Sequence, residues 1–175
     1  MIGFLTPKGI ISKSEKNRLL LWIKNNQDKF LFNVEGPYRK RFRFDCENVE
    51  ISNTLENIKK RIIKKENING WIKEPLLGDY ISQITNGGYI QRHIDPTILG
   101  FSHVRYNLFL SLPVVGGRPI YDDKIIDISE NQYLKCESSS YFHGCENVYG
   151  EKPRIVISYG FLIVDQRGDT GAAIF

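Results

Sequence analysis

From Gly70 onward the chain consists of short β-type runs separated by turn residues, and this pattern limits the fold more than any other feature of the sequence. The runs are YISQIT, GYIQRHI, VRYNLFLSL, RPIY, KIIDI, QYLKCES and RIVISYGFLIV. The breaks between them carry Gly, Pro, Asn and Asp, the residues that favour turns. Many short strands without intervening helices predict a sandwich or a barrel-like jelly roll.

The segment before Gly70 predicts two helices and two strands. Ser12 or Ser14 can cap a helix in EKNRLLLWIKNNQDKF, where apolar residues recur at helical spacing. A second helix is predicted in SNTLENIKKRIIKKEN, which has an apolar stripe opposite a lysine-rich face. FLFNV and RFRFD between them are predicted strands. We therefore predict a mainly β (α+β) fold with N-terminal helices packed outside a jelly roll.

Composition indicates one globular domain over residues 1–175, because 41% of the residues are hydrophobic and 25% are charged. No apolar run has the length of a membrane-spanning helix, and the N-terminus does not read as a secretory signal. The three cysteines, Cys46, Cys136 and Cys145, match no zinc-finger spacing and are expected to be reduced. These features predict a cytoplasmic protein without membrane association.

Positive charge gathers in the first part of the chain. Residues 1–70 carry 15 Lys and Arg against 8 Asp and Glu, whereas residues 71–175 carry 9 against 12. The runs YRKRFRF and KKRIIKK suit either a solvated surface or a surface that binds nucleic acid. No nucleic-acid-binding motif accompanies them, so we favour the solvated surface.

A candidate metal site begins in GGYIQRHIDPT. On a strand, His93 and Asp95 point to the same face and can present an imidazole and a carboxylate to one point. A third ligand is expected from a distant strand, and His143 in SSSYFHGCENV is the candidate; His103 is the one other histidine. Two His and one Asp suit Fe(II), although zinc hydrolases use similar sets. Cys145, two residues after His143, is a less favoured thiolate ligand than a packing residue.

A candidate anion-binding residue follows. Arg154 begins RIVISYGFLIV, a run apolar enough for a central buried strand. A buried guanidinium requires an anionic partner, and a carboxylate matches its planar geometry. Ser158 lies on the same strand face and can donate a further hydrogen bond. An internal salt bridge or an exposed start of the strand would explain Arg154 equally well.

Taken in order, the His-x-Asp motif, the Gly-Gly turn in PVVGGRPIYDD, the distal histidine and the arginine in GEKPRIVISYGFLIV resemble the 2-oxoglutarate and Fe(II)-dependent oxygenase superfamily. The resemblance covers about residues 77–164. It implies a double-stranded β-helix, a jelly-roll variant, with helices of residues 1–76 buttressing one sheet. It also implies that His93, Asp95 and His143 ligate Fe(II), and that Arg154 binds the distal carboxylate of 2-oxoglutarate.

The chain departs from this pattern at two places. Many members of the superfamily carry Arg-x-Ser, whereas position 156 is Val, so a contact from Ser158 is not a motif match. The tyrosine that commonly contacts the co-substrate is not marked by a motif, and Tyr80, Tyr89 and Tyr106 are all candidates. Among these we assign Tyr89 to 2-oxoglutarate binding.

Two further residues share a strand face in VRYNLFL. Asn107 is assigned to co-substrate binding and Arg105 to a substrate carboxylate, with packing at the core edge or surface exposure as the alternatives.

The resemblance implies a hydroxylase that uses Fe(II), 2-oxoglutarate and O2 and releases succinate and CO2. The expected substrate is an aliphatic C–H bond of a peptide side chain such as prolyl, or of a free amino acid or other small metabolite. A nucleic-acid substrate is disfavoured because no base-stacking aromatic residues can be identified. The alternatives are a non-enzymatic jelly-roll binding module and a zinc-dependent jelly-roll enzyme. Arg154 separates them, since neither alternative needs an anion-binding arginine near three convergent ligands.

Overall fold

The protein is described by a computed structural model that covers residues 9–32, 38–45, 47–97 and 100–164. Its helical elements are α1 (Lys13–Asn25), the 3-10 turn η1 (Gln27–Lys29) and α2 (Ser52–Glu66). Its strands are β1 (Leu31–Phe32), β2 (Arg39–Arg43), β3 (Trp71–Lys73), β4 (Tyr80–Ile84), β5 (Ile90–His93), β6 (Phe101–Ser111), β7 (Val115–Gly116), β8 (Pro119–Tyr121), β9 (Lys124–Ile125), β10 (Tyr133–Glu137), β11 (His143–Cys145), β12 (Val148–Tyr149) and β13 (Arg154–Val164). Both predicted helices are confirmed.

Helix α1 begins at the predicted cap. Ser12 Oγ accepts a hydrogen bond from the Glu15 backbone N–H at 3.2 Å, and the Glu15 carboxylate accepts one from the Ser12 N–H at 2.9 Å. This reciprocal pair forms a capping box, which satisfies two backbone donors at the helix start. The apolar side of the helix buries Leu19, Trp22 and Ile23.

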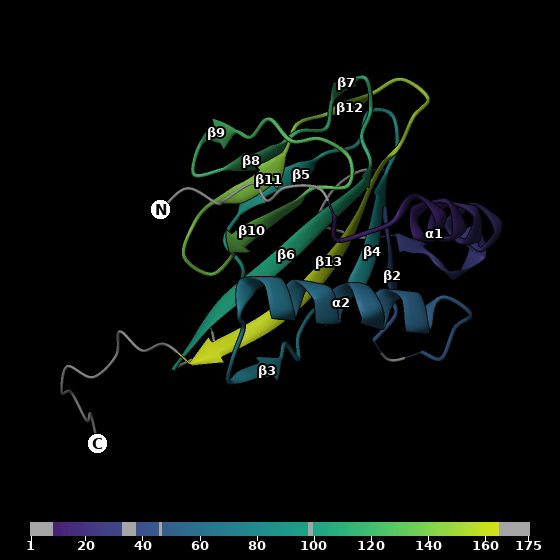
Figure 1. Ribbon diagram of the computed structural model, residues 1–175. Helices are drawn as coiled ribbons and strands as arrows, with labels where there is room; N and C mark the ends of the chain where they lie inside the picture. The colour runs from purple at the N-terminus through teal and green to yellow at the C-terminus, as the bar shows by residue number, and fades with distance from the viewer. Residues whose placement is uncertain (1–8, 33–37, 46, 98–99, 165–175) are drawn as a thin grey trace.

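The described strands form two main sheets that face each other. The large sheet has seven strands in the order β1-β2-β4-β13-β6-β10, with β3 also paired to β13. The small sheet has four strands in the order β5-β11-β8-β9, and a short β12-β7 pair lies beside them. Figure 1 shows α2 crossing one face of the large sheet, with the small sheet on its other side. This arrangement confirms the predicted double-stranded β-helix with helices outside.

The two faces of the large sheet have different partners. Ile157 and Tyr159 of β13 pack into the main apolar core together with Leu55 of α2. Arg154 and Ser158, at alternate positions of β13, point to the opposite face, between the sheets. The predicted central strand is confirmed, since β13 is hydrogen-bonded to both β4 and β6.

Several strand boundaries differ from the prediction. KIIDI contributes only the two residues of β9, and β3, β7 and β12 were not predicted. His143 begins β11, a strand of only three residues that was not among the predicted β-type runs. Asp95 lies two residues beyond the end of β5, although its backbone N–H is still held by the Ser138 carbonyl at 2.9 Å. These short elements depend on partners distant in sequence, which local patterns do not reveal.

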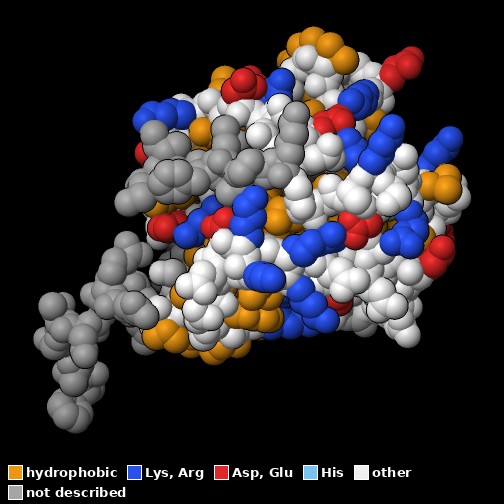
Figure 2. All heavy atoms as spheres, viewed as in Figure 1, with side chains coloured by type: hydrophobic (Ala, Val, Ile, Leu, Met, Phe, Trp, Pro, Cys, Tyr) orange, Lys and Arg blue, Asp and Glu red, His pale blue; other side chains and the backbone are white. Residues whose placement is uncertain are grey.

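The run KKRIIKK lies on α2, where part of its charge is paired. Lys59 forms a buried ion pair with Asp79 at 2.6 Å, and Arg61 pairs with Glu15 at 2.7 Å. On the face seen in Figure 2, Lys and Arg side chains are interspersed with acidic and hydrophobic ones. Lys59 is therefore a buried member of this run, in contrast to the predicted solvated surface, while the interspersed charges on the face seen in Figure 2 agree with that prediction.

The structure also bears on the predictions about the cysteines and about membrane-spanning helices. Cys136 and Cys145 are free and buried, whereas Cys46 lies outside the described residues. Neither α1 nor α2 is long and apolar enough for a membrane crossing, and the described residues contain no other helix that is.

Candidate active site

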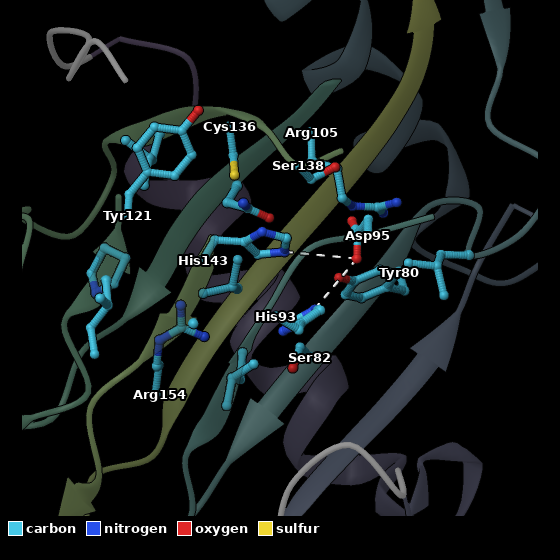
Figure 3. Close-up of a pocket in the computed structure, with 18 of the residues that line it drawn as sticks. Tyr80, Ser82, His93, Asp95, Arg105, Tyr121, Cys136, Ser138, His143 and Arg154 are labelled. Carbon is cyan, nitrogen blue, oxygen red and sulfur yellow. Dashed lines mark ion pairs between the residues drawn. The ribbon is translucent and has the colours of Figure 1, made fainter. Parts of the chain in front are cut away.

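The strand pairing brings His93, Asp95 and His143 together. His93 and His143 are direct partners in the β5–β11 register, and their ring centroids lie 4.3 Å apart. Asp95 Oδ1 lies 3.4 Å from His93 Nε2 and 3.7 Å from His143 Nε2. Figure 3 shows the three side chains turned toward one another. The predicted cluster therefore exists as a geometric unit.

Backbone contacts orient both imidazoles. His93 Nδ1 lies 2.8 Å from the Gln91 carbonyl oxygen, and His143 Nδ1 lies 3.1 Å from the Tyr141 carbonyl oxygen. A carbonyl can only accept, so each Nδ1 carries the proton. In the neutral rings each Nε2 then presents its lone pair toward Asp95, which is the arrangement that metal-binding histidines have.

The pKa shifts of His143 and Asp95 favour the protonation states that metal ligands need. Burial lowers the pKa of His143, and the neighbouring His93 adds to this effect against the opposing charge of Asp95. Burial would raise the pKa of Asp95, but when the imidazoles are protonated the hydrogen bond with His93 and the charge of His143 outweigh it and hold that pKa well below its usual range. A neutral imidazole and an ionised carboxylate are the forms that bind a metal ion.

A divalent metal fits this cluster. The three ligand atoms lie within 4.8 Å of one another, and they form the one such group found among the described residues. Ligand atoms about 2.1 Å from a metal on one octahedral face lie about 3 Å apart, so a small inward rotation of the side chains completes the site. Cys145 does not belong to the cluster, because it packs with Ile84 and Val148 instead.

A cavity between the two sheets connects the cluster to Arg154; we call it the inter-sheet cavity, and its lining includes His93, Asp95, Arg105, Asn107, His143 and Arg154. Arg154 is only 5% exposed. Its Nε donates to the Gly117 carbonyl at 2.9 Å, and its guanidinium lies 5.1 Å from the Phe109 ring centroid. No carboxylate of the described residues forms an ion pair with it, so the internal salt bridge considered above is not found in that part of the chain.

The Gly-Gly turn fixes the carbonyl that Arg154 contacts. Gly116 and Gly117 have φ values of +70° and +66°, which glycine adopts without strain. A Cβ atom at Gly117 would also lie 2.6 Å from a ring carbon of Pro113. The turn thus requires glycine at this position and orients the arginine toward the cavity.

Arg105, Asn107 and Ser158 form one hydrogen-bonded network. Ser158 Oγ donates to Asn107 Oδ1 at 2.6 Å and accepts from Arg105 Nε at 2.9 Å. Arg105 also donates to Glu74 at 3.1 Å and to the Gly78 carbonyl at 2.7 Å. Arg105 and Asn107 line the inter-sheet cavity, whereas Ser158 does not. All three nitrogens of the Arg105 guanidinium already have protein partners.

The three candidate tyrosines lie in different places. Tyr80 lines the inter-sheet cavity, Tyr106 packs into the core on the helix side, and Tyr89 is not part of the cavity lining. Burial would raise the pKa of Tyr80, but the charges of Arg105, Arg41 and Arg39 outweigh it and lower that pKa.

Two arginines of YRKRFRF were not expected at this site. Arg39 and Arg41 line the inter-sheet cavity from β2, whereas the prediction placed the whole run on a solvated surface. Strand alternation explains the difference, because Phe42 packs into the helix-side core and its neighbours at alternate positions point between the sheets. The alternation of charged and aromatic residues was visible in the sequence, but the sequence did not show that the arginines would point between the two sheets.

A second pocket reaches the cluster from another side. It is lined by Leu76, Leu77, Gln91, Arg92, His93, Asp95, Pro96 and His103. It shares His93, Asp95 and Leu77 with the inter-sheet cavity, so two separate spaces meet at two of the three candidate ligands. Sequence reasoning gave no role to His103 or to the buried Glu74, because neither belongs to a motif.

Comparison with known proteins establishes the class of fold. No protein-family model matches the sequence, and no curated protein matches it at a significant level. Solved structures do match, and they include 2-oxoglutarate-bound proteins and prolyl hydroxylases. The chain therefore has the double-stranded β-helix fold of the 2-oxoglutarate and Fe(II)-dependent oxygenases, as the resemblance in sequence implied.

Three of these structures show how far the similarity extends. HygX from Streptomyces hygroscopicus, with nickel, 2-oxoglutarate and hygromycin B bound, superposes with a TM-score of 0.71 at 11% identity, covering 92% of this chain and 82% of that one. The viral collagen prolyl hydroxylase of Paramecium Bursaria Chlorella virus-1 gives 0.68 at 14% identity, with 94% and 97% covered. A Trichoplax adhaerens prolyl hydroxylase in complex with a peptide fragment of the hypoxia inducible factor oxygen degradation domain gives 0.69 at 12% identity, with 94% and 84% covered.

Proposed function

We propose that the protein is an Fe(II)- and 2-oxoglutarate-dependent hydroxylase. The observation that carries this proposal is the joint lining of one cavity by a His-Asp-His cluster and by a buried arginine. A metal-binding module without catalysis would have no use for that arginine, and neither would a zinc hydrolase.

His93, Asp95 and His143 would hold the metal through Nε2, Oδ1 and Nε2. Three protein ligands on one octahedral face leave the remaining positions for a co-substrate and O2. The bound Fe(II) would supply the oxidising chemistry, in which 2-oxoglutarate is converted to succinate and CO2 while a substrate C–H bond is hydroxylated. The protein contributes the placement of both substrates and the exclusion of water.

Arg154 would bind the distal carboxylate of 2-oxoglutarate. Its Nε is held by Gly117, so the guanidinium has a fixed orientation and its terminal nitrogens can pair with a carboxylate. Asn107, in the same lining, is the assigned polar contact, with Ser158 supporting it by a hydrogen bond. Among the candidate tyrosines, the geometry favours Tyr80 over the assigned Tyr89, because Tyr80 lines the cavity.

The substrate would enter through the second pocket, which meets the cluster at His93 and Asp95. Leu76, Leu77 and Pro96 give that pocket an apolar wall suited to an aliphatic group. We therefore propose that the substrate is a peptide side chain such as prolyl, or a free amino acid or small metabolite, and we favour these over a nucleic acid. Arg105, assigned to a substrate carboxylate, is better suited to a supporting role because of its contacts with Glu74 and Gly78.

The test is an anaerobic titration of the metal-free protein with Fe(II) and 2-oxoglutarate, which together give a weak visible charge-transfer band when both bind. We expect a band for the unchanged protein and none for His143→Ala. For Arg154→Leu we expect the same band at 2-oxoglutarate concentrations about 10- to 100-fold higher, since a carboxylate–arginine pair is lost. Arg61→Leu, on α2 and paired with Glu15, is the matched control and should leave the titration unchanged.

Absence of a band from the unchanged protein at saturating Fe(II) and 2-oxoglutarate would rule out the proposal. Once binding is established, succinate formation in air should be measured with proline-containing peptides and with free amino acids. The substrate belongs to the class of compounds, peptides or free amino acids, that increases succinate formation and yields an equal amount of hydroxylated product. We also propose a cytoplasmic location, where the buried thiols Cys136 and Cys145 would stay reduced.

A further inference from the structure

Two buried polar atoms next to the candidate metal site have no hydrogen-bond partner among the residues that the structure describes. They are Asp95 Oδ2 and His103 Nδ1, and they lie 3.8 Å apart. The two residues are 5% and 1% exposed, so water does not readily replace a missing partner. Unsatisfied polar atoms in the interior are costly and rare, and two that face each other call for an explanation.

The other ring nitrogen of His103 determines where the proton resides. His103 Nε2 lies 3.4 Å from Arg105 Nη1, closer than its 4.0 Å separation from Glu74 Oε2. A guanidinium nitrogen can only donate, so Nε2 faces a donor and must accept. The neutral imidazole then carries its proton on Nδ1, which points to Asp95.

Arg105 is held in a fixed position, so its guanidinium can determine which ring nitrogen of His103 carries the proton. Its guanidinium is fixed by Glu74, whose carboxylate also accepts the backbone N–H groups of Leu76, Leu77 and Gly78. A Cβ atom at Gly160 would come within 2.9 Å of both Arg105 Nη1 and Glu74 Cβ, so glycine at this position leaves room for the ion pair. The chain Glu74–Arg105–His103 therefore ends in a donor aimed at Asp95, one of the three candidate ligands.

We propose that His103 is a positioning residue that donates its Nδ1–H to Asp95 Oδ2. The separation of 3.8 Å is about 1 Å longer than an N–H···O hydrogen bond, and a small rotation of the carboxylate closes it. With Oδ2 held by His103, only Oδ1 faces His93 and His143, so the carboxylate binds the metal through one oxygen. This keeps a coordination position open for the co-substrate, and the inference rests on the metal site of the proposed function.

Substitutions of His103 can separate a donor role from a packing role. In His103→Asn the amide nitrogen takes the place of Nδ1 and keeps a donor toward Asp95. In His103→Gln the amide is displaced to the position of Nε2, and His103→Leu has no donor at all. A pure packing role would make Leu the best-tolerated replacement in this buried position.

The measurements are Fe(II) affinity by anaerobic calorimetric titration and the visible spectrum of the Co(II)-loaded protein, which reports the coordination number. We expect His103→Leu and His103→Gln to bind Fe(II) about 10- to 100-fold more weakly and to change the Co(II) spectrum, as loss of an outer hydrogen bond does at other metal sites. His103→Asn should retain the spectrum and nearly all of the affinity. If His103→Leu fails to fold, as judged by thermal unfolding, His103→Gln carries the test.

The outcomes separate this inference from the proposed function. If His103→Leu or His103→Gln matches the unchanged protein in Fe(II) affinity and Co(II) spectrum, His103 does not position Asp95, and the proposed function is unaffected. If the affinity of His103→Asn falls as far as that of His103→Leu, the δ-position donor is not the cause. If the unchanged protein binds neither Fe(II) nor Co(II), the metal site itself is wrong and this inference falls with it.

Discussion

The two faces of the large sheet are made by the same strands, but one packs into an apolar core and the other carries the polar residues of the candidate active site. Toward the helices, Ile157, Tyr159 and Phe161 of β13 are fully buried among apolar side chains. Toward the small sheet, Arg154 and Ser158 of the same strand are buried among polar groups. On the helix side, other apolar residues of similar volume would pack nearly as well. On the side of the small sheet, stability and ligand binding depend on the position of each hydrogen-bond donor and acceptor.

This difference predicts that substitutions on the helix side change stability and leave ligand binding intact. On the inner face, the expected effect depends on whether a charge has a partner within the protein. The four changes below run from the largest expected loss of stability to the smallest.

Arg105→Met should cause the largest loss, about 3–5 kcal/mol in the free energy of unfolding, because Glu74 is left as a buried charge. The Arg105 and Glu74 side chains are 3% and 0% exposed, so water cannot compensate. Urea unfolding measures the loss. Adding Glu74→Gln to Arg105→Met removes the buried charge and should restore part of the stability; a double variant less stable than Arg105→Met would contradict this account.

Ile157→Ala should lower the free energy of unfolding by about 3 kcal/mol, because it leaves a cavity in the helix-side core. The Fe(II) and 2-oxoglutarate titration of the folded variant should be unchanged. Ile157→Val, which removes a single methylene group, is the matched control and should lose about 1 kcal/mol. A weakened charge-transfer band in folded Ile157→Ala would show that the two faces are not independent.

Glu130→Gln should lose about 1 kcal/mol at pH 7, because Glu130 pairs with Lys16 of α1 and with Lys152. Burial would raise the pKa of Glu130, but Lys152 and Lys16 outweigh it and lower that pKa from 4.5 to about 2. The stabilisation is therefore complete above pH 4.5 and disappears as the pH falls through about 2. Urea unfolding from pH 7 to pH 2 should show the two proteins converging; a constant difference would contradict the assignment.

Arg154→Met should have the smallest effect on stability, below about 1 kcal/mol, because it removes a buried charge that has no carboxylate partner in the described part of the chain. Its effect on 2-oxoglutarate binding should be large. Thermal unfolding without and with 2-oxoglutarate and metal separates the two effects, since a ligand that binds only the folded state raises its stability. A large loss without ligand would mean that Arg154 is a structural residue.

The sequence predicted the fold class where the pattern was local. RIVISYGFLIV was recognisable as a buried central strand because nearly every position is apolar. A helix cap at Ser12 or Ser14 was recognisable because a serine comes just before the apolar helical pattern, and the structure uses Ser12. The order of His93, Asp95, His143 and Arg154 along the chain marked the cluster that the strand register brings together.

The rest depends on contacts that no local pattern contains. Glu74 and His103 become neighbours of the cluster only when β6 and the segment before β4 pack together. The sequence placed Ser158 on the correct strand face. Its hydroxyl nevertheless hydrogen-bonds to Arg105 and Asn107 and does not line the cavity. Strand alternation gives the direction of a side chain, but the neighbours it meets come from pairing across the sheet.

The direct pairing of His93 with His143 has a further consequence for how the chain moves. An ion held by both residues and by Asp95 would join β5, the segment that follows it, and β11, which are far apart in the sequence. It would act as a reversible cross-link that restricts local opening of the small sheet, because such opening would have to break metal bonds. Amide hydrogen exchange in β5 and β11 would then be faster in metal-free protein, while exchange in the helix-side core would stay the same.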